Sequence, residues 1–134
     1  KLSFVQEEMW LIDNFGELQQ IMLIRHGEPA LNKKGWKNKI AGGLTHSGSP
    51  SGDKQGTLLY MAINASQHSM IWVGASDMSN AETGVNRLGS YMGVMGQSEP
   101  DMSGAPAQVD SGDLMSANLY GQRLVALAQK MSAA

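Results

Sequence analysis

Residues 39–74, KIAGGLTHSGSPSGDKQGTLLYMAINASQHSMIWVG, decide the fold of this chain. The stretch opens with the apolar run Ile40–Leu44 and closes with the apolar run Met70–Gly74, and both are typical of buried strands. Between them lie a loop of small residues, 45–53, and a helical pattern over 54–69. This order predicts a β-loop-α-β unit with parallel strands. Ligands of such sheets bind outside the carboxyl ends of the strands, so the loop is the first candidate site.

Length and composition exclude several classes of protein. A chain of 134 residues has room for one domain, and its net charge of −2 lacks the basic surface that nucleic acid or anionic lipid requires. The absence of cysteine removes disulfides and thiolate nucleophiles, and it is typical of a reducing compartment. The sequence has neither a signal-peptide pattern nor an apolar run of about 20 residues. We therefore expect a cytoplasmic domain with no membrane or nucleic-acid partner.

The first 34 residues have a character of their own. Apolar spacing over 3–20 predicts a helix, and the apolar run Ile21–Ile24 predicts a short strand. The strand is followed by Arg25-His26-Gly27-Glu28 and then by Asn32. This segment resembles the N-terminal signature of the histidine phosphatase superfamily. The resemblance implies that His26 is a phosphoryl-accepting nucleophile and that Arg25 holds the phosphoryl oxygens, roles that suit an imidazole and a guanidinium.

The phosphatase resemblance stops near Asn32. A complete site of that kind needs a second arginine, an acid and a second histidine, and neither His46 nor His68 stands in the required context. The alternative interpretation of Arg25 and His26 is a strand end without a complete site.

A different family resemblance covers about 100 residues from Gly35 onward. It is carried by the segment 35–43, the loop 45–53, the stretch 67–74, the segment 86–91 and the tail 112–130. These segments resemble, in order, the C-terminal half of flavodoxin-like NAD(P)H-dependent FMN reductases of the quinone reductase type. The resemblance implies an α/β fold, flavodoxin-like and three-layered with a parallel sheet, and FMN as the cofactor.

The same resemblance implies the cofactor-binding residues. The loop would wrap the flavin and its ribityl chain, the histidine after the helix would approach the cofactor, and residues 86–91 would lie near the isoalloxazine and a subunit interface. The implied cofactor-binding residues are Ser47, Gly48, Ser49, Pro50, Ser51, Gly52 and His68. Small residues also let backbone N–H groups approach a ligand, although such loops are often plain turns. The acidic loop 75–82 lacks metal-ligand spacing, so no metal site is expected.

The flavodoxin-like part is expected to be incomplete. Residues 1–38 show neither the first strand with its phosphate-binding loop nor the third strand of such a domain. We interpret the chain as a single domain in which residues 1–34 are a segment of separate origin and 35–134 are a flavodoxin-like C-terminal half. A small sheet with exposed edges favours a homo-oligomer.

Two helices complete the prediction. The helix over 54–69 is expected to bury one face, and the final helix over 113–131 is expected to close the domain with an apolar stripe. The face assigned to the first helix consists of Leu58, Leu59, Ala62 and Ile63, and the stripe of the second consists of Ala117, Tyr120, Leu124, Ala128 and Met131.

Three functions remain open from the sequence. The leading one is an FMN-binding oxidoreductase in which NAD(P)H reduces the flavin and a quinone or similar small molecule accepts the electrons, with an impaired cofactor site. The second is phosphoryl transfer through His26. The third is an oligomeric scaffold without catalysis.

Overall fold

The computed structural model describes residues 36–99 and 108–132. The helix predicted over 3–20 and the strand predicted over 21–24 lie outside these residues. The described part contains, in chain order, β1 (Ile40–Ala41), β2 (Leu44–Ser47), α1 (Lys54–Gln67), β3 (Ile71–Trp72), β4 (Val94–Gln97) and α2 (Ser111–Ser132).

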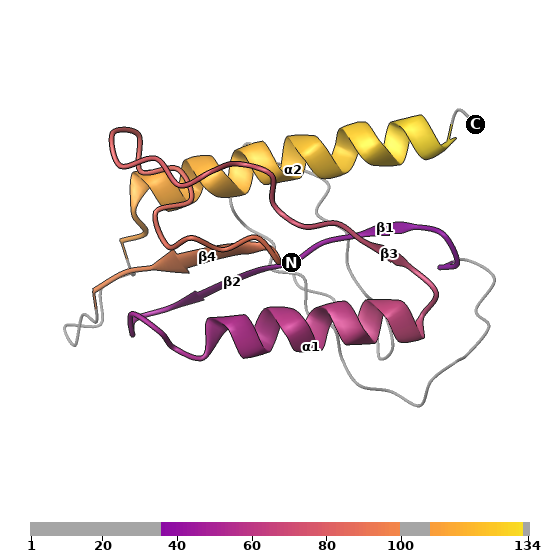
Figure 1. Ribbon diagram of the computed structural model, residues 1–134, viewed down its shortest axis with the longest axis horizontal. Coiled ribbons are helices and arrows are strands. Elements are labelled where there is room, and N and C mark those ends of the chain that lie inside the picture. The colour runs from indigo at the N-terminus through magenta and orange to yellow at the C-terminus, as the bar shows by residue number, and fades with distance from the viewer. Residues whose placement is uncertain (1–35, 100–107, 133–134) are drawn as a thin grey trace, which may run out of the picture.

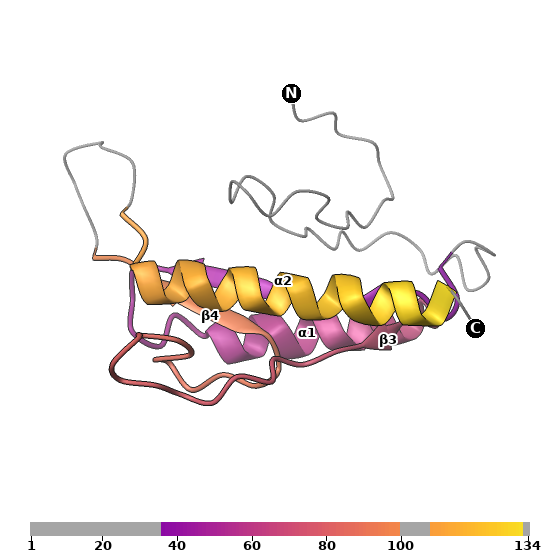
Figure 2. The same ribbon diagram turned by 90° about the horizontal axis from the view of Figure 1, so that it is seen from above.

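The two helices cover opposite faces of the strands, so the described part has three layers. Figure 1 shows α1 below and α2 above the strands, and Figure 2 shows the same stacking from the α2 side. The consecutive glycines Gly42 and Gly43, between β1 and β2, face these two layers in turn. A Cβ on Gly42 would lie within 2.9 Å of the Leu124 methyl groups of α2, and one on Gly43 would lie 2.8 Å from the Met61 methyl group of α1. Both helices therefore pack directly on backbone.

The described strands form two two-stranded sheets, and both are parallel. β1 pairs with β3 in the register Ile40 to Ile71, and β2 pairs with β4 in the register Ser47 to Gln97. The carbonyls of Lys39, Ala41 and Gly43 accept in turn from the N–H groups of Ile71, Val73 and Val94, at 2.8, 2.8 and 3.1 Å. Carbonyls of alternate residues point to the same edge of an extended strand. β3 and β4 thus lie end to end along one edge of residues 39–47.

The segment 74–93 leaves this edge between β3 and β4 and returns to it. Its neck is closed by the Ala75 N–H, which donates to the Tyr91 carbonyl at 3.0 Å, and by the Trp72 indole N–H, which donates to the Met92 carbonyl at 2.9 Å. The excursion is therefore anchored where it begins and where it ends.

The core is divided between the two faces of the sheet. On the α1 side, Leu58 and Met61 pack against Trp72, Met92 and Met95, and Ala65 packs with Ala41 and Met70. On the α2 side, Val94, Ala117 and Tyr120 are buried together with Leu44, Ala75 and Leu124 around them. Helix α2 therefore uses the first half of its predicted stripe, whereas Met131 at its end is 42% exposed.

Several predicted boundaries are corrected. Thr45, His46 and Ser47 belong to β2 and not to the loop. Helix α1 ends at Gln67 because Ser69 adopts a left-handed backbone, with φ 60°, and the Met70 N–H turns back to the Ala65 carbonyl. The strand predicted over Met70–Gly74 is shorter in the structure, where β3 comprises only Ile71 and Trp72. Strand β4 was not predicted.

The predicted buried face of α1 is right at Leu58 and wrong at Leu59 and Ile63. Leu58, Met61 and Ala65 point into the core, whereas Leu59 is 44% exposed and Ile63 is 60% exposed. Residues 58–63 are apolar without interruption, so the sequence offers several apolar faces for this helix. The face that is buried is the one on which Leu58 and Met61 pack against Trp72 and Met61 approaches the backbone of Gly43.

Candidate functional site

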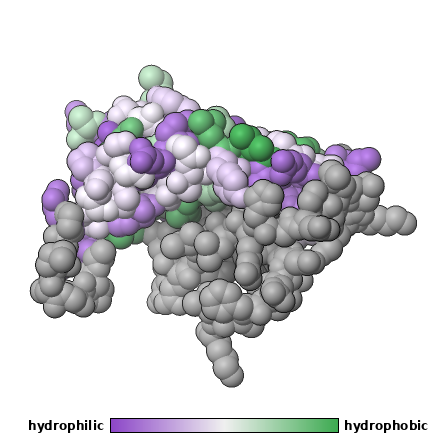
Figure 3. Space-filling model, turned by 90° about the horizontal axis from the view of Figure 1, so that it is seen from below, coloured by the Kyte–Doolittle hydropathy of each residue, from purple (hydrophilic) through white to green (hydrophobic). Residues whose placement is uncertain are grey.

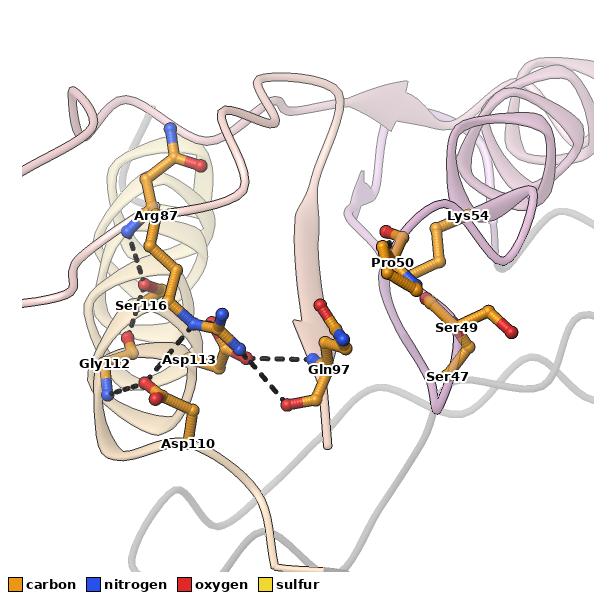
Figure 4. Close-up of polar contacts among 11 residues, drawn as sticks. Ser47, Ser49, Pro50, Lys54, Arg87, Gln97, Asp110, Gly112, Asp113 and Ser116 are labelled. Atoms are coloured by element: carbon orange, nitrogen blue, oxygen red, sulfur yellow. Dashed lines mark hydrogen bonds and ion pairs between the residues drawn. The ribbon is translucent and has the colours of Figure 1, made fainter. Parts of the chain in front are cut away.

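The candidate site lies at the carboxyl ends of β2 and β4. These ends are adjacent because Ser47 pairs with Gln97. The loop 48–53 leaves β2 here and enters α1, and on the other face of the sheet α2 begins nearby with Ser111. Figure 4 shows two clusters of polar contacts in this region, one around Lys54 and one around Arg87 and Asp113. The sequence placed the site at this edge, and the structure puts the loop there.

Lys54 fills the inside of the loop. This first residue of α1 is only 1% exposed, and its ammonium donates to the Ser47 hydroxyl at 3.0 Å, the Ser49 carbonyl at 2.8 Å and the Pro50 carbonyl at 3.0 Å. An ammonium has three N–H bonds, so all of its donors are used. The Ser47 hydroxyl in turn donates to the Ser49 carbonyl at 2.9 Å. Residues 47–50 are thereby bound to one buried positive charge.

The outer side of the loop is open to a ligand. Ser49, Pro50, Ser51 and Gly52 are exposed, and Gly52 has a positive φ of 52° that permits the tight turn into α1. Within the described residues, no acceptor pairs with the backbone N–H groups of Gly48, Ser51 and Gly52. The loop can therefore offer backbone donors to a ligand outside it.

The N-terminus of α1 is likewise uncapped. Asp53 stands at the N-cap with a left-handed backbone, φ 49°, its side chain makes no capping hydrogen bond, and the first turn contains no acid. The N–H groups of Gln55 and Gly56 have no acceptor among the described residues. Unpaired N–H groups and the helix dipole both favour a negative ligand group here.

The second cluster is centred on Asp113 of α2. The Arg87 guanidinium donates to both carboxylate oxygens of Asp113, at 2.9 and 2.7 Å, and the Gln97 N–H donates to the same carboxylate at 2.9 Å. Asp113 is 3% exposed, and its hydrogen bond to Arg87 is the main cause that raises the pKa of Arg87. The pair fastens the excursion 74–93 and the end of β4 to α2. We assign it a structural role.

Asn86 anchors the predicted segment 86–91. Its side-chain amide donates to the Asp77 carbonyl at 2.8 Å and accepts from the Ser90 N–H at 2.8 Å, while its backbone N–H donates to the Ser116 hydroxyl at 2.8 Å. These bonds hold the segment against the start of α2, and Tyr91 at the end of the segment is 51% exposed. The interface role expected for this segment stays a prediction.

The structure does not bring His68 to the loop. His68 follows α1 and the loop precedes it, so the 14 residues of the helix separate them by about 21 Å. The His68 ring lies against Trp36, with 6.2 Å between ring centroids. Within one chain, His68 and residues 47–52 thus belong to different ends of the fold.

The phosphatase residues lie outside the described part. Arg25, His26 and Asn32 fall within residues 1–35, so their predicted roles stay predictions. In the described ranges, no three His, Cys, Asp or Glu side chains gather where they could hold a metal ion. The helices found there are also too short or too polar to cross a bilayer.

Sequence reasoning missed Lys54, Asp113 and the hydroxyl of Tyr120. The residue Lys54 had a detectable signal, because it is the only charged residue in α1 and directly follows the loop. Asp113 and its partner Arg87 are 26 residues apart, and no local pattern links them.

The fold is flavodoxin-like α/β, with parallel strands between two helical layers, and comparison with known proteins agrees. The chain is 38% identical over 104 residues to flavodoxin FldP of Pseudomonas aeruginosa (strain UCBPP-PA14), covering 73% of this chain and 55% of that protein. It also resembles the crystal structure of a WrbA-like flavodoxin from Agrobacterium tumefaciens, with a TM-score of 0.50 and 34% identity over 71% of this chain and 46% of the other.

The chain spans about half the length of these two relatives. No family model matches it. The predicted fold class is confirmed, whereas the histidine phosphatase resemblance of residues 21–32 gains no support from either relative.

Proposed function

We propose that the chain binds FMN at residues Ser47–Gly52, the last residue of β2 and the loop after it, and acts as an NAD(P)H-dependent flavin oxidoreductase of the quinone reductase type. The observation that carries the proposal is the loop itself: exposed, glycine-containing, held from inside by Lys54, and placed at the carboxyl ends of parallel strands. In flavodoxin-like folds FMN binds at this end of the sheet. Both relatives are named flavodoxins.

The residues present suit FMN. The backbone N–H groups of Gly48, Ser51 and Gly52 can donate to carbonyl, hydroxyl or phosphate oxygens of the cofactor, and the hydroxyls of Ser49 and Ser51 add further donors. The unpaired N–H groups at the start of α1 favour the negative charge that FMN carries, and the Asp53 carboxylate at the N-cap makes no capping hydrogen bond to them. Bound FMN would supply hydride acceptance from NAD(P)H and electron transfer to a quinone. The protein would bind the flavin and orient it.

Self-association forms part of the proposal. The only charged residue of α1 is the buried Lys54, so the outer face of this helix is uncharged and presents Leu59 and Ile63. Figure 3 views the molecule from the α1 side and shows apolar groups among the polar ones on this face. Leu59 and Ile63 are neighbours on the helix surface because they are four residues apart, and contiguous exposed apolar groups mark association surfaces. In a homo-oligomer, His68 of another copy could reach the flavin that it does not reach within its own chain. We place the protein in the cytoplasm on the absence of cysteine.

A titration of the full chain into FMN tests the proposal. We expect saturable quenching of flavin fluorescence and retention of yellow colour through a desalting column. Bound flavin should then be reduced by NADPH or NADH, and a quinone should reoxidise it and sustain repeated turnover. Free FMN at the same concentration is the control for the second step. A chain that neither quenches nor retains FMN would refute the binding site, and retained FMN without quinone-dependent turnover would refute only the enzymatic part.

A further inference from the structure

We propose that Lys54 makes the loop an anion receptor, and that the negative charge of the flavin nucleotide docks against residues 48–52 because of it. This inference rests on the FMN site proposed above and adds a positioning and specificity-determining residue to it.

The first argument is charge. The Lys54 ammonium is 1% exposed, and all three groups that accept from it are neutral oxygens: one hydroxyl and two carbonyls. In the described part of the chain, no carboxylate forms an ion pair with it; the ion pairs there join Arg87 to Asp110 and Asp113. Burying a charge without a counter-charge is costly. A negative ligand group at the loop would supply the missing counter-charge.

The second argument is geometry. In a trans peptide, the C=O of one residue and the N–H of the next point to opposite sides. The Pro50 carbonyl points inward to the Lys54 ammonium, so the Ser51 N–H points away from it, toward the outer side of the loop. The Ser51 N–H has no acceptor among the described residues. Lys54 thus both supplies charge and turns a backbone donor outward.

The negative charge on the ligand has two sources, and they give different results. One is the phosphate of FMN, which riboflavin lacks. The other is the isoalloxazine ring, which becomes anionic when it is reduced. A phosphate against the loop makes the preference for FMN over riboflavin depend on Lys54. A ring against the loop makes the reduction potential of the bound flavin depend on Lys54.

The test compares the wild type, Lys54→Met, Lys54→Arg and the control Lys130→Met, which removes an exposed lysine near the end of α2. FMN and riboflavin are titrated separately into each full chain, and the circular dichroism spectrum verifies that each variant is folded. We expect Lys54→Met to weaken FMN binding about tenfold or more, as the loss of a charged partner does. Lys54→Arg should recover part of the affinity, and Lys130→Met should bind like the wild type.

Selectivity and potential then identify the source of the charge. Loss of the preference for FMN in Lys54→Met assigns the charge to the phosphate. Little change in the affinity for either oxidised flavin, together with a more negative reduction potential of the bound flavin, assigns it to the ring, which is anionic only when reduced. Unchanged affinity, selectivity and potential in a folded Lys54→Met would overturn the inference while the FMN site stood.

A second measurement needs no flavin. Inorganic phosphate is titrated into the protein, and the amide resonances of Gly48, Ser51 and Gly52 are followed by NMR. We expect saturable shifts in the wild type that are absent in Lys54→Met, with the amides of Leu114 and Met115 in α2 as an internal control. Shifts without flavin binding would refute the proposed FMN site and keep the anion receptor. Shifts that are equal in both proteins would overturn the role of Lys54.

Discussion

The hydroxyl of Tyr120, on α2, donates a hydrogen bond to the carbonyl of Val73, the residue at which the chain leaves the edge of the sheet. The same hydroxyl accepts from the Gly43 N–H at 3.2 Å. In an uninterrupted parallel ladder these two backbone groups would bond to each other, since the Val73 N–H already donates to Ala41. Tyr120 therefore inserts into the ladder where β3 ends, and its ring ties α2 to the break.

Replacing Tyr120 by Phe should destabilise the protein by about 1–3 kcal/mol. The ring still fills its place in the core, but two buried backbone groups lose their partner. Urea denaturation followed by circular dichroism measures the loss. Tyr91→Phe is the matched control, because Tyr91 is 51% exposed, and we expect it to change the stability by less than about 0.5 kcal/mol. Equal effects of the two substitutions would contradict the role given to the hydroxyl.

The same tyrosine gives a pH dependence. Burial is the main cause that raises the pKa of Tyr120 from 10.0 to about 12. The unfolded chain therefore loses this proton at a lower pH than the folded protein, so the contribution of Tyr120 to stability is complete below pH 10 and declines as the pH rises toward 12. The difference in unfolding free energy between wild type and Tyr120→Phe should shrink across that window. A constant difference would show that the folded and unfolded states ionise alike.

The ion pair of Arg87 and Asp113 should be strongly coupled. A double-mutant cycle with Arg87→Met and Asp113→Asn is expected to give about 1.5–3 kcal/mol, because Asp113 is 3% exposed and the contact is bidentate. The cycle of Arg87→Met with Asp110→Asn is the control. That pair is 3.4 Å apart and Asp110 has a side chain 44% exposed, so its coupling should stay below about 1 kcal/mol. Similar coupling in both cycles would contradict the account of this cluster.

Gly52 in the loop and Gly56 in the first turn of α1 lie four residues apart. A Cβ at Gly52 would meet the Ser47 side chain, and its φ of 52° disfavours any other residue, whereas a Cβ at Gly56 meets nothing within 4 Å. Gly52→Ala should therefore weaken both the fold and FMN binding. Gly56→Ala should stabilise α1 by up to about 1 kcal/mol and keep FMN binding. Thermal denaturation measures the stability of both variants, and FMN titration measures their affinity for the cofactor. Undiminished FMN affinity in Gly52→Ala would contradict the assignment of the loop to the FMN site.

Local patterns predicted the elements that local forces determine. The order of strand, loop, helix and strand over 39–74 and the start of α1 at Lys54 agree with the structure, because apolar runs and small-residue loops act over short distances. Strand β4 could not be predicted in the same way. Its sequence, Val-Met-Gly-Gln, has little strand propensity, and it is a strand because β2, about 50 residues earlier, offers it an edge.

The candidate site likewise combines features that local sequence predicts with features that only the folded chain creates. The loop was predicted because its small residues are consecutive in the sequence. Lys54 was assigned only to the helix that it begins, since a lysine at a helix end is ordinarily solvated. Its burial depends on three acceptors brought inward by the turn at Gly52, which only the folded loop supplies. The prediction that His68 approaches the cofactor came from the family resemblance and did not consider the length of α1, which separates His68 from the loop.

The most direct test of the central claim is amide hydrogen exchange measured residue by residue, with and without FMN. We expect FMN to slow exchange at Gly48, Ser51 and Gly52, whose N–H groups have no acceptor among the described residues. Exchange at Ile71, Val73 and Val94 should be slow in both states, since these groups bond within the sheet. Exchange at the exposed Ala81 and Glu82 should stay unchanged. Protection confined to other residues, or no protection by FMN at all, would contradict the assignment of the loop as the flavin site.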